Sequence, residues 1–172
     1  MLEMIKAQIR DIPDFPAPGI LFKDITPLLG HPDAFTQTIH LLAERYREQP
    51  IDYVVGVEAR GFVVGAALAA KLNTGFVMVR KPGKLPADTL QATYELEYGS
   101  DTLEIHRDAL PPGARVILVD DVLATGGTMS AVIELVNALQ GKIHELAFLI
   151  ELTFLNGRDR LQGHNLFSLI QY

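Results

Sequence analysis

The chain of 172 residues contains no cysteine. It can therefore form no disulfide, offer no thiolate to a metal and use no thiol as a nucleophile. Any chemistry must come from oxygen and nitrogen groups, and the composition fits a reducing compartment.

Positive charge and long apolar runs are also scarce. Lys and Arg number 15 against 21 Asp and Glu, a formal net charge of -6, which argues against a protein that mainly neutralises nucleic-acid phosphates or anionic lipid. The longest uncharged apolar stretch, Gly61 to Ala70, is far shorter than the roughly 20 residues that a spanning helix needs. The first residues carry Glu3, Lys6 and Arg10 and so lack the apolar stretch of a signal peptide. We expect a cytoplasmic protein with no nucleic-acid or membrane partner.

A length of 172 residues with 48% hydrophobic residues predicts one globular domain, residues 1–172. From about residue 52 onward, short apolar runs alternate with helical patterns. Near-continuous apolar runs such as Val116 to Val119 and Leu146 to Ile150 are typical of strands covered by helices on both faces. The sequence therefore predicts a doubly wound α/β fold with a mostly parallel sheet flanked by helices. We expect its strands at residues 52–57, 75–80, 115–120 and 143–150, with helices at 61–71 and 128–140.

The N-terminal segment, residues 1–30, is predicted to form a small hood, a short segment beside the main sheet. Residues 1–10 favour a short amphipathic helix, and the proline-rich residues 11–29 predict an ordered loop with short extended pieces and no regular helix. A helix is predicted at residues 32–49. Phe15 and Phe22 are equally compatible with a small apolar cluster under the loop and with the wall of a binding pocket.

The most informative stretch is VILVDDVLATGGT, residues 116–128. An apolar strand is followed at its end by Asp120 and Asp121 and then by a Thr-Gly-Gly-Thr loop that opens a helix. Adjacent strand residues point to opposite faces, so the carboxylates are either separate hydroxyl acceptors or one ligand contact and one structural contact. The loop is suited to a phosphate monoester, because glycine amides and a helix N-terminus bind anions. Together they indicate a sugar-phosphate site rather than a mere strand-end turn.

This stretch closely resembles the phosphoribosyl-diphosphate signature of the type I phosphoribosyltransferases. Further matching segments are collinear from residue 13 to the C-terminus, namely PDFPAPGILFKDITPLL, VEARGF, RKPGKLP, YELEYGSDTLEIHRDAL, VDDVLATGGTM and FSLIQY. The resemblance implies transfer of 5-phosphoribose from phosphoribosyl diphosphate to N9 of adenine, giving AMP and pyrophosphate in purine salvage. It also implies Mg2+ as cofactor, held mainly through the substrate, and a homodimer. We assign no metal ligands among the side chains.

The resemblance carries specific roles to residues of this chain. It implies that the ribose and its 5-phosphate bind at Asp120, Asp121, Ala124, Thr125, Gly126, Gly127 and Thr128. It implies that pyrophosphate binds at Glu58, Ala59, Arg60, Arg80, Lys81 and Lys84, and that adenine binds at Leu21, Phe22 and Lys23. Relatives often have a non-proline cis peptide in the loop that here would join Glu58 to Ala59. From the residues alone, Arg60 could instead pair with Glu58 at the surface.

Residues 80–101 are expected to form a flexible lid. Three cations, Arg80, Lys81 and Lys84, open the loop at residues 81–91, and a hairpin of residues 92–98 and 102–106 follows. A charge run is more often a solvated face, but the negative net charge favours a lid over a diphosphate. Spacing does not choose between Glu95 and Glu97 as an acid/base group. The resemblance implies Glu97 as the residue that exchanges a proton with N7, Arg60 as a catalytic cation and Tyr98 as a gate.

Two other functions remain open at this point. One is a phosphoribosyltransferase for a different base, such as xanthine or hypoxanthine, whose sugar-phosphate half would be the same. The other is a regulator that senses phosphoribosyl diphosphate with a retired catalytic domain, which would need a DNA-binding segment.

Overall fold

The computed structural model describes residues 1–96 and 99–172. The chain divides into two compact units, Met1–Arg45 and Tyr46–Tyr172. One domain over residues 1–172 stays a prediction. Among the described residues, no helix has the length and apolar character that crossing a membrane requires.

The first unit begins with helix α1 (Leu2–Lys6), which is shorter than expected. Strand β1 (Arg10–Ile12) pairs antiparallel with β2 (Phe22–Asp24), and helices α2 (Thr26–Gly30) and α3 (Pro32–Tyr46) follow. The expectation of no regular helix in residues 11–29 was wrong at its end, where α2 begins. Pro27 lies in the first turn of α2, where a missing N–H costs no hydrogen bond.

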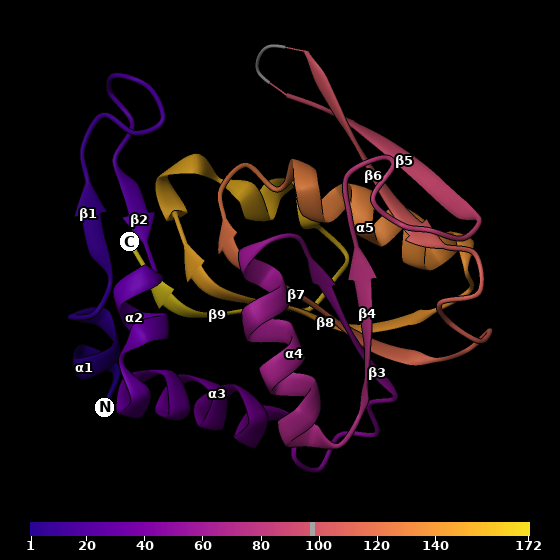
Figure 1. The fold of residues 1–172 in the computed structure, drawn as a ribbon, viewed down its shortest axis with the longest axis horizontal. Coiled ribbons are helices and arrows are strands. Elements are labelled where there is room, and N and C mark those ends of the chain that lie inside the picture. Colours follow the sequence, from indigo (N-terminus) through magenta and orange to yellow (C-terminus); the bar gives the residue numbers. More distant parts are fainter. Residues whose placement is uncertain (97–98) are drawn as a thin grey trace. The chain divides into compact units, whose positions relative to one another are not determined.

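The second unit is built on a parallel sheet, which confirms the doubly wound prediction. Its strands follow the order β4-β3-β7-β8-β9, and every neighbouring pair is parallel (Figure 1). The strands are β3 (Tyr53–Val57), β4 (Gly75–Val79), β7 (Arg115–Leu123), β8 (Lys142–Glu151) and β9 (Leu166–Gln171). Helix α4 (Arg60–Leu72) connects β3 to β4, and α5 (Gly127–Ala138) connects β7 to β8.

The two crossovers leave the sheet centre in opposite directions, because β3 continues to β4 on one side and β7 to β8 on the other. Right-handed crossovers then put α4 and α5 on opposite faces. The carboxyl ends of β3 and β7 form the topological switch point, where ligands bind in such sheets. Pairing of β3 with β7 ends at Gly56 and Val119. Beyond Val119, the edge of β7 that faces β3 has no strand partner among the described residues, so a ligand can approach it.

Strand β7 is longer than predicted. It pairs with β8 as far as Leu123 and Glu151, so Asp120 and Asp121 lie within the strand rather than after it. The expected end at residue 120 was wrong because hydrogen bonds to β8 continue the strand past its apolar run. This pairing keeps both carboxylates on a rigid element.

The predicted hairpin is present as β5 (Thr89–Glu95) and β6 (Ser100–His106), paired antiparallel. It begins at Thr89, so residues 89–95 and 100–101 of the lid expected at residues 80–101 are strand, and residues 81–88 are irregular. Besides α2, three elements were not expected: β9 and the 3-10 helices η1 (Thr153–Leu155) and η2 (Gly157–Leu161). The apolar core joins the sheet, α5 and the hairpin through residues such as Leu118, Leu135 and Leu103.

Candidate active site

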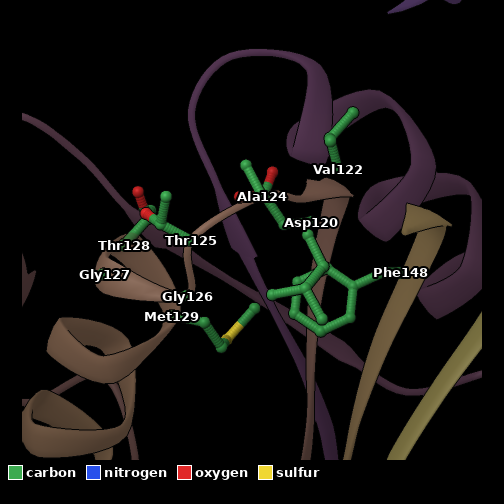
Figure 2. A pocket seen from close by; sticks show the side chains of 10 residues that line it. Asp120, Val122, Ala124, Thr125, Gly126, Gly127, Thr128, Met129 and Phe148 are labelled. Carbon is green, nitrogen blue, oxygen red and sulfur yellow. The ribbon is translucent and has the colours of Figure 1, made fainter. Parts of the chain in front are cut away.

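A small cavity of about 60 Å³ lies at the carboxyl end of β7. Figure 2 shows the Asp120 and Val122 side chains from the strand on one side, with Thr125 from the following loop and Thr128 from the first turn of α5 on the other. The structure thus brings together the predicted ribose and phosphate residues with the exception of Asp121. The full lining is Asp120, Val122, Leu123, Ala124, Thr125, Gly126, Gly127, Thr128, Met129 and Phe148.

The loop that follows β7 has the geometry of an anion site. Gly126 has a φ of 84°, a left-handed conformation that favours glycine, and α5 begins at the next residue. The first turn of a helix exposes unpaired N–H groups and carries partial positive charge, which attracts a phosphate. The cavity is therefore bounded by a helix N-terminus, which favours anions, and by the carboxylate of Asp120.

The two adjacent carboxylates have different partners. Asp121 is buried, and its Oδ2 lies 2.7 Å from Arg60 Nε, an ion pair without aligned hydrogen-bond geometry. Asp120 lines the cavity, and its Oδ1 accepts a hydrogen bond of 2.9 Å from the Asp121 amide. This geometry favours one ligand contact, Asp120, and one structural contact, Asp121. Arg60 is thus paired with Asp121.

The charge of Asp120 is unfavourable in the folded protein. Burial of its carboxyl group raises its pKa well above the usual value, and the neighbouring negative charge of Asp121 raises it further. A ligand hydroxyl that donates to this carboxylate would relieve part of that cost. Gly61 lets α4 begin directly against this group, because a Cβ there would lie 2.8 Å from Asp120 Oδ1.

The loop between β3 and α4 holds two of the predicted pyrophosphate residues, Glu58 and Ala59, and a third, Arg60, begins α4. The Glu58–Ala59 peptide bond is cis, as the resemblance implies. Glu58 Oε2 lies 2.6 Å from Lys84 Nζ, and Glu58 Oε1 accepts a 2.6 Å hydrogen bond from the Lys81 amide. Burial would raise the pKa of Glu58, but Lys84, the Lys81 amide and Arg80 outweigh it and hold that pKa below its ordinary value. Glu58 therefore stays ionised and ties the start of the lid to this loop.

The lid cations all have carboxylate partners in this structure. Arg80 Nε lies 3.5 Å from Glu58 Oε1, and its guanidinium lies over the Phe62 ring at 5.7 Å from the centroid. Lys81 Nζ lies 3.0 Å from Asp101 Oδ2 on β6, which raises the pKa of Lys81 and lowers that of Asp101. A diphosphate that reaches these cations must compete with Glu58 and Asp101.

The residues considered for binding or protonating the base belong to two parts of the chain. Glu97 and Tyr98 lie outside the described residues, whereas Glu95 is exposed at the end of β5. Leu21, Phe22 and Lys23 belong to the first unit, where the Phe15 and Phe22 rings meet edge to face at 5.1 Å and Lys23 Nζ lies 2.6 Å from Asp11 Oδ1. The role of these residues in binding adenine stays a prediction.

Sequence reasoning missed the contribution of η2. Gly157 packs against Leu123 and Ala124, where the loop predicted to bind phosphate leaves β7. The Asn156-Gly157 dipeptide is a turn signal that could have located η2, but it gives no indication of what the turn touches.

The chain was compared with known proteins. A family model described as phosphoribosyl transferase domain matches residues 25–162. A curated adenine phosphoribosyltransferase of Halothermothrix orenii is 57% identical over 167 residues, which are 97% of this chain and 98% of that protein. The crystal structure of adenine phosphoribosyltransferase from Thermoanaerobacter pseudethanolicus is 55% identical, covers 100% of both chains and superposes with a TM-score of 0.98.

A second similar structure contains bound ligands. It is the adenine phosphoribosyltransferase of Saccharomyces cerevisiae complexed with an imino-altritol bisphosphate and adenine, 45% identical with a TM-score of 0.92 over 98% of this chain and 97% of that one. The parallel sheet, the cavity at its switch point and these matches show that the chain belongs to the phosphoribosyl transferase family. Within that family it groups with the adenine phosphoribosyltransferases.

Proposed function

We propose that the chain transfers 5-phosphoribose from phosphoribosyl diphosphate to N9 of adenine, producing AMP and pyrophosphate in purine salvage. The observation that carries this proposal is the cavity at the end of β7, where the anion-binding start of α5 faces the carboxylate of Asp120. A phosphate and a neutral hydroxyl on one small ligand satisfy both groups. Adenine is proposed as the base because the similar proteins are named adenine phosphoribosyltransferases.

The ribose-phosphate end of the substrate would occupy this cavity. The 5-phosphate accepts hydrogen bonds from the amides and hydroxyls of residues 124–128, and Asp120 accepts one from a ribose hydroxyl. Asp121 contributes through Arg60, whose guanidinium it holds at 2.7 Å near the pyrophosphate loop. This arrangement fixes the sugar while leaving its anomeric carbon free to react.

Pyrophosphate would bind between the Glu58–Arg60 loop and the lid cations. The anomeric carbon develops positive charge as its bond to pyrophosphate breaks, as in glycoside cleavage. The leaving group carries the developing negative charge, so Arg60, Arg80 and Lys84 would stabilise the transition state most. Lys84 would exchange Glu58 for the diphosphate when the lid closes and excludes water.

The base would be bound and protonated by residues whose roles rest on the resemblance. Leu21 and Phe22 would supply apolar walls for adenine, and the backbone of Lys23 would bond its edge. Glu97 would exchange a proton with N7, and Tyr98 would gate the pocket.

Mg2+ is proposed as the cofactor, held mainly through the substrate's phosphates and hydroxyls. The ion prefers oxygen ligands and keeps its water, and the carboxylate of Asp120 on the cavity is a donor of that kind. When bound it would neutralise charge on the diphosphate. A homodimer and a cytoplasmic location are also proposed, and sedimentation equilibrium would test the first.

A panel of nucleobases with phosphoribosyl diphosphate, scored for pyrophosphate release with and without Mg2+, tests the proposal. Release with adenine and Mg2+ only is the expected result. Release with hypoxanthine or xanthine in place of adenine would identify a different base, and no release with any base would contradict the proposal. In that last case, a gel shift with DNA that depends on phosphoribosyl diphosphate would indicate a regulator.

A further inference from the structure

The 3-10 helix η2 packs directly against the loop that bounds the cavity. A Cβ at Gly157 would overlap the carbonyl oxygen of Ala124 and lie 2.9 Å from Leu123 Cδ1. A Cβ at Gly126 would in turn lie 2.6 Å from the carbonyl oxygen of Gly157. The two backbones thus touch with no side chain between them, so a movement of η2 must move the loop.

The contact continues along the outside of the loop. The Arg160 side chain passes the loop glycines, since a Cβ at Gly126 would lie 3.2 Å from Arg160 Cβ, and one at Gly127 2.9 Å from Arg160 Nη1. The loop is therefore backed by η2 from Ala124 to Gly127, which is most of the stretch proposed to bind the 5-phosphate.

One ion pair fixes η2 to the sheet. Arg158 donates from Nε to Glu151 Oε1 at 2.6 Å and from Nη2 to Glu151 Oε2 at 2.7 Å, a two-pronged geometry that only arginine provides. Glu151 is 3% exposed and ends β8, where it is paired in register with Leu123 of β7. Ser168 and Gln171 of β9 also donate to it.

Glu151 is well suited to be a fixed anchor. The Arg158 guanidinium lowers the pKa of Glu151, so the carboxylate is ionised at neutral pH. A buried ionised carboxylate needs all its partners, because removing one leaves an unpaired charge. The position of η2 is therefore set by a strong, directional contact one residue away from Gly157.

We propose that Arg158 and Glu151 are positioning residues for the sugar-phosphate site. Their ion pair holds η2, and η2 holds the backbone of residues 124–127 in the shape that binds phosphate. This inference rests on the proposed role of that loop. Neither residue lines the cavity; both act through the loop backbone, where small displacements cost binding.

The chain offers a matched control at the opposite end of the sheet. Arg115 begins β7 and donates from Nε and Nη2 to the carboxylate of Asp52, at 3.3 Å and 3.4 Å. Arg115 and Arg158 side chains are both 46% exposed. Arg115→Gln therefore breaks an arginine–carboxylate pair far along the strand from the cavity, with a carboxylate that is more exposed (40%) than that of Glu151 (4%).

The test uses the full chain and ribose 5-phosphate as the probe, measured by titration calorimetry, together with steady-state kinetics. For Arg158→Gln we expect the Kd of ribose 5-phosphate and the KM of phosphoribosyl diphosphate to rise about 10- to 100-fold. The KM of adenine and kcat at saturation should stay within about threefold. Arg158→Lys keeps the positive charge but lacks the planar guanidinium that makes two hydrogen bonds to one carboxylate. It should therefore recover part of the affinity. Arg115→Gln should leave the Kd within about twofold.

The inference is overturned if folded Arg158→Gln binds ribose 5-phosphate as tightly as the parent, or if Arg115→Gln weakens binding equally. If Arg158→Gln does not fold, Gly157→Ala replaces it, with Gly30→Ala as control because a Cβ there meets nothing within 4 Å. Gly157→Ala should weaken binding, and an unchanged Kd overturns the inference. If the parent itself binds no ribose 5-phosphate, the proposed function of the loop fails instead.

Discussion

Replacing Asp120 by asparagine should make the protein more stable and its ligand binding weaker. Burial and the adjacent charge of Asp121 raise the pKa of Asp120 in the folded state above its unfolded value. A group of this kind contributes stability at pH values below its unfolded pKa, and that stability is lost as the pH rises through the folded pKa. At neutral pH the parent therefore bears a cost that Asp120→Asn removes.

The substitution should raise the stability of the protein and lower its affinity for ribose 5-phosphate, and the two effects are measured separately. Removing an unfavourable buried charge typically raises the free energy of unfolding by about 1 kcal/mol, which raises Tm by about 2–4 °C in a domain of this size. The amide keeps an oxygen that can accept the Asp121 N–H, so the local backbone is retained. A hydrogen bond from a ribose hydroxyl to a charged group contributes about 1.5–3 kcal/mol, so ribose 5-phosphate should bind about 10- to 150-fold more weakly.

The assay combines thermal unfolding at several pH values with calorimetric binding of ribose 5-phosphate. The Tm advantage of the variant over the parent should grow from acid to neutral pH. Asp121→Asn is the contrasting variant, because it breaks the buried pair with Arg60 and should lower Tm. If Asp120→Asn lowered Tm at pH 7 and left the Kd unchanged, the reasoning about this carboxylate would be refuted.

Three further predictions concern other carboxylates. Glu97→Gln should lower kcat far more than it weakens phosphoribosyl-diphosphate binding, while Glu95→Gln should have little effect; equal rates for Glu97→Gln and the parent would remove it from the acid/base role. Glu58→Gln should release Lys84 and tighten pyrophosphate binding by roughly two- to fivefold in inhibition assays, which is the size expected when an ion pair with an exposed lysine is lost. Weaker binding would instead show that pyrophosphate binding requires the Glu58 carboxylate. Asp24 has its pKa lowered to about 2, mainly by hydrogen bonds from Thr26 and Arg10, so its contribution to stability is present above about pH 4 and is lost as the pH falls towards 2. Urea unfolding of Asp24→Asn should differ from the parent by less than about 1 kcal/mol at pH 5 and converge with it at pH 2, and a gap that persists at pH 2 would exclude titration of Asp24 as the cause.

The elements with a clear apolar period were predicted from the sequence to within a few residues. The α3 and α4 helices and the strands β3, β4 and β8 follow from apolar spacing alone, because burial of one face or of both faces dictates that spacing. The end of β7 was misplaced because its last residues are held by hydrogen bonds to β8, which the side chains do not reveal. The α2 helix was missed because Pro27 reads as a helix breaker unless its place in the first turn is known.

The site was predicted in part. The Asp pair, the glycine loop and the following helix are contiguous, so local sequence is enough to bring Asp120 and Gly126 together. The partner of Asp121 is Arg60, on another strand–helix connection, and only the order of strands in the sheet brings them within 2.7 Å. The same limit applies to η2, whose contact with the loop depends on how β8 lies beside β7.

A crystal structure of the chain with AMP tests the central claim most directly. The account predicts the phosphate on the amides and hydroxyls of residues 124–128 and a ribose hydroxyl on Asp120. A nucleotide bound elsewhere, with the cavity at the end of β7 holding only solvent, would contradict it.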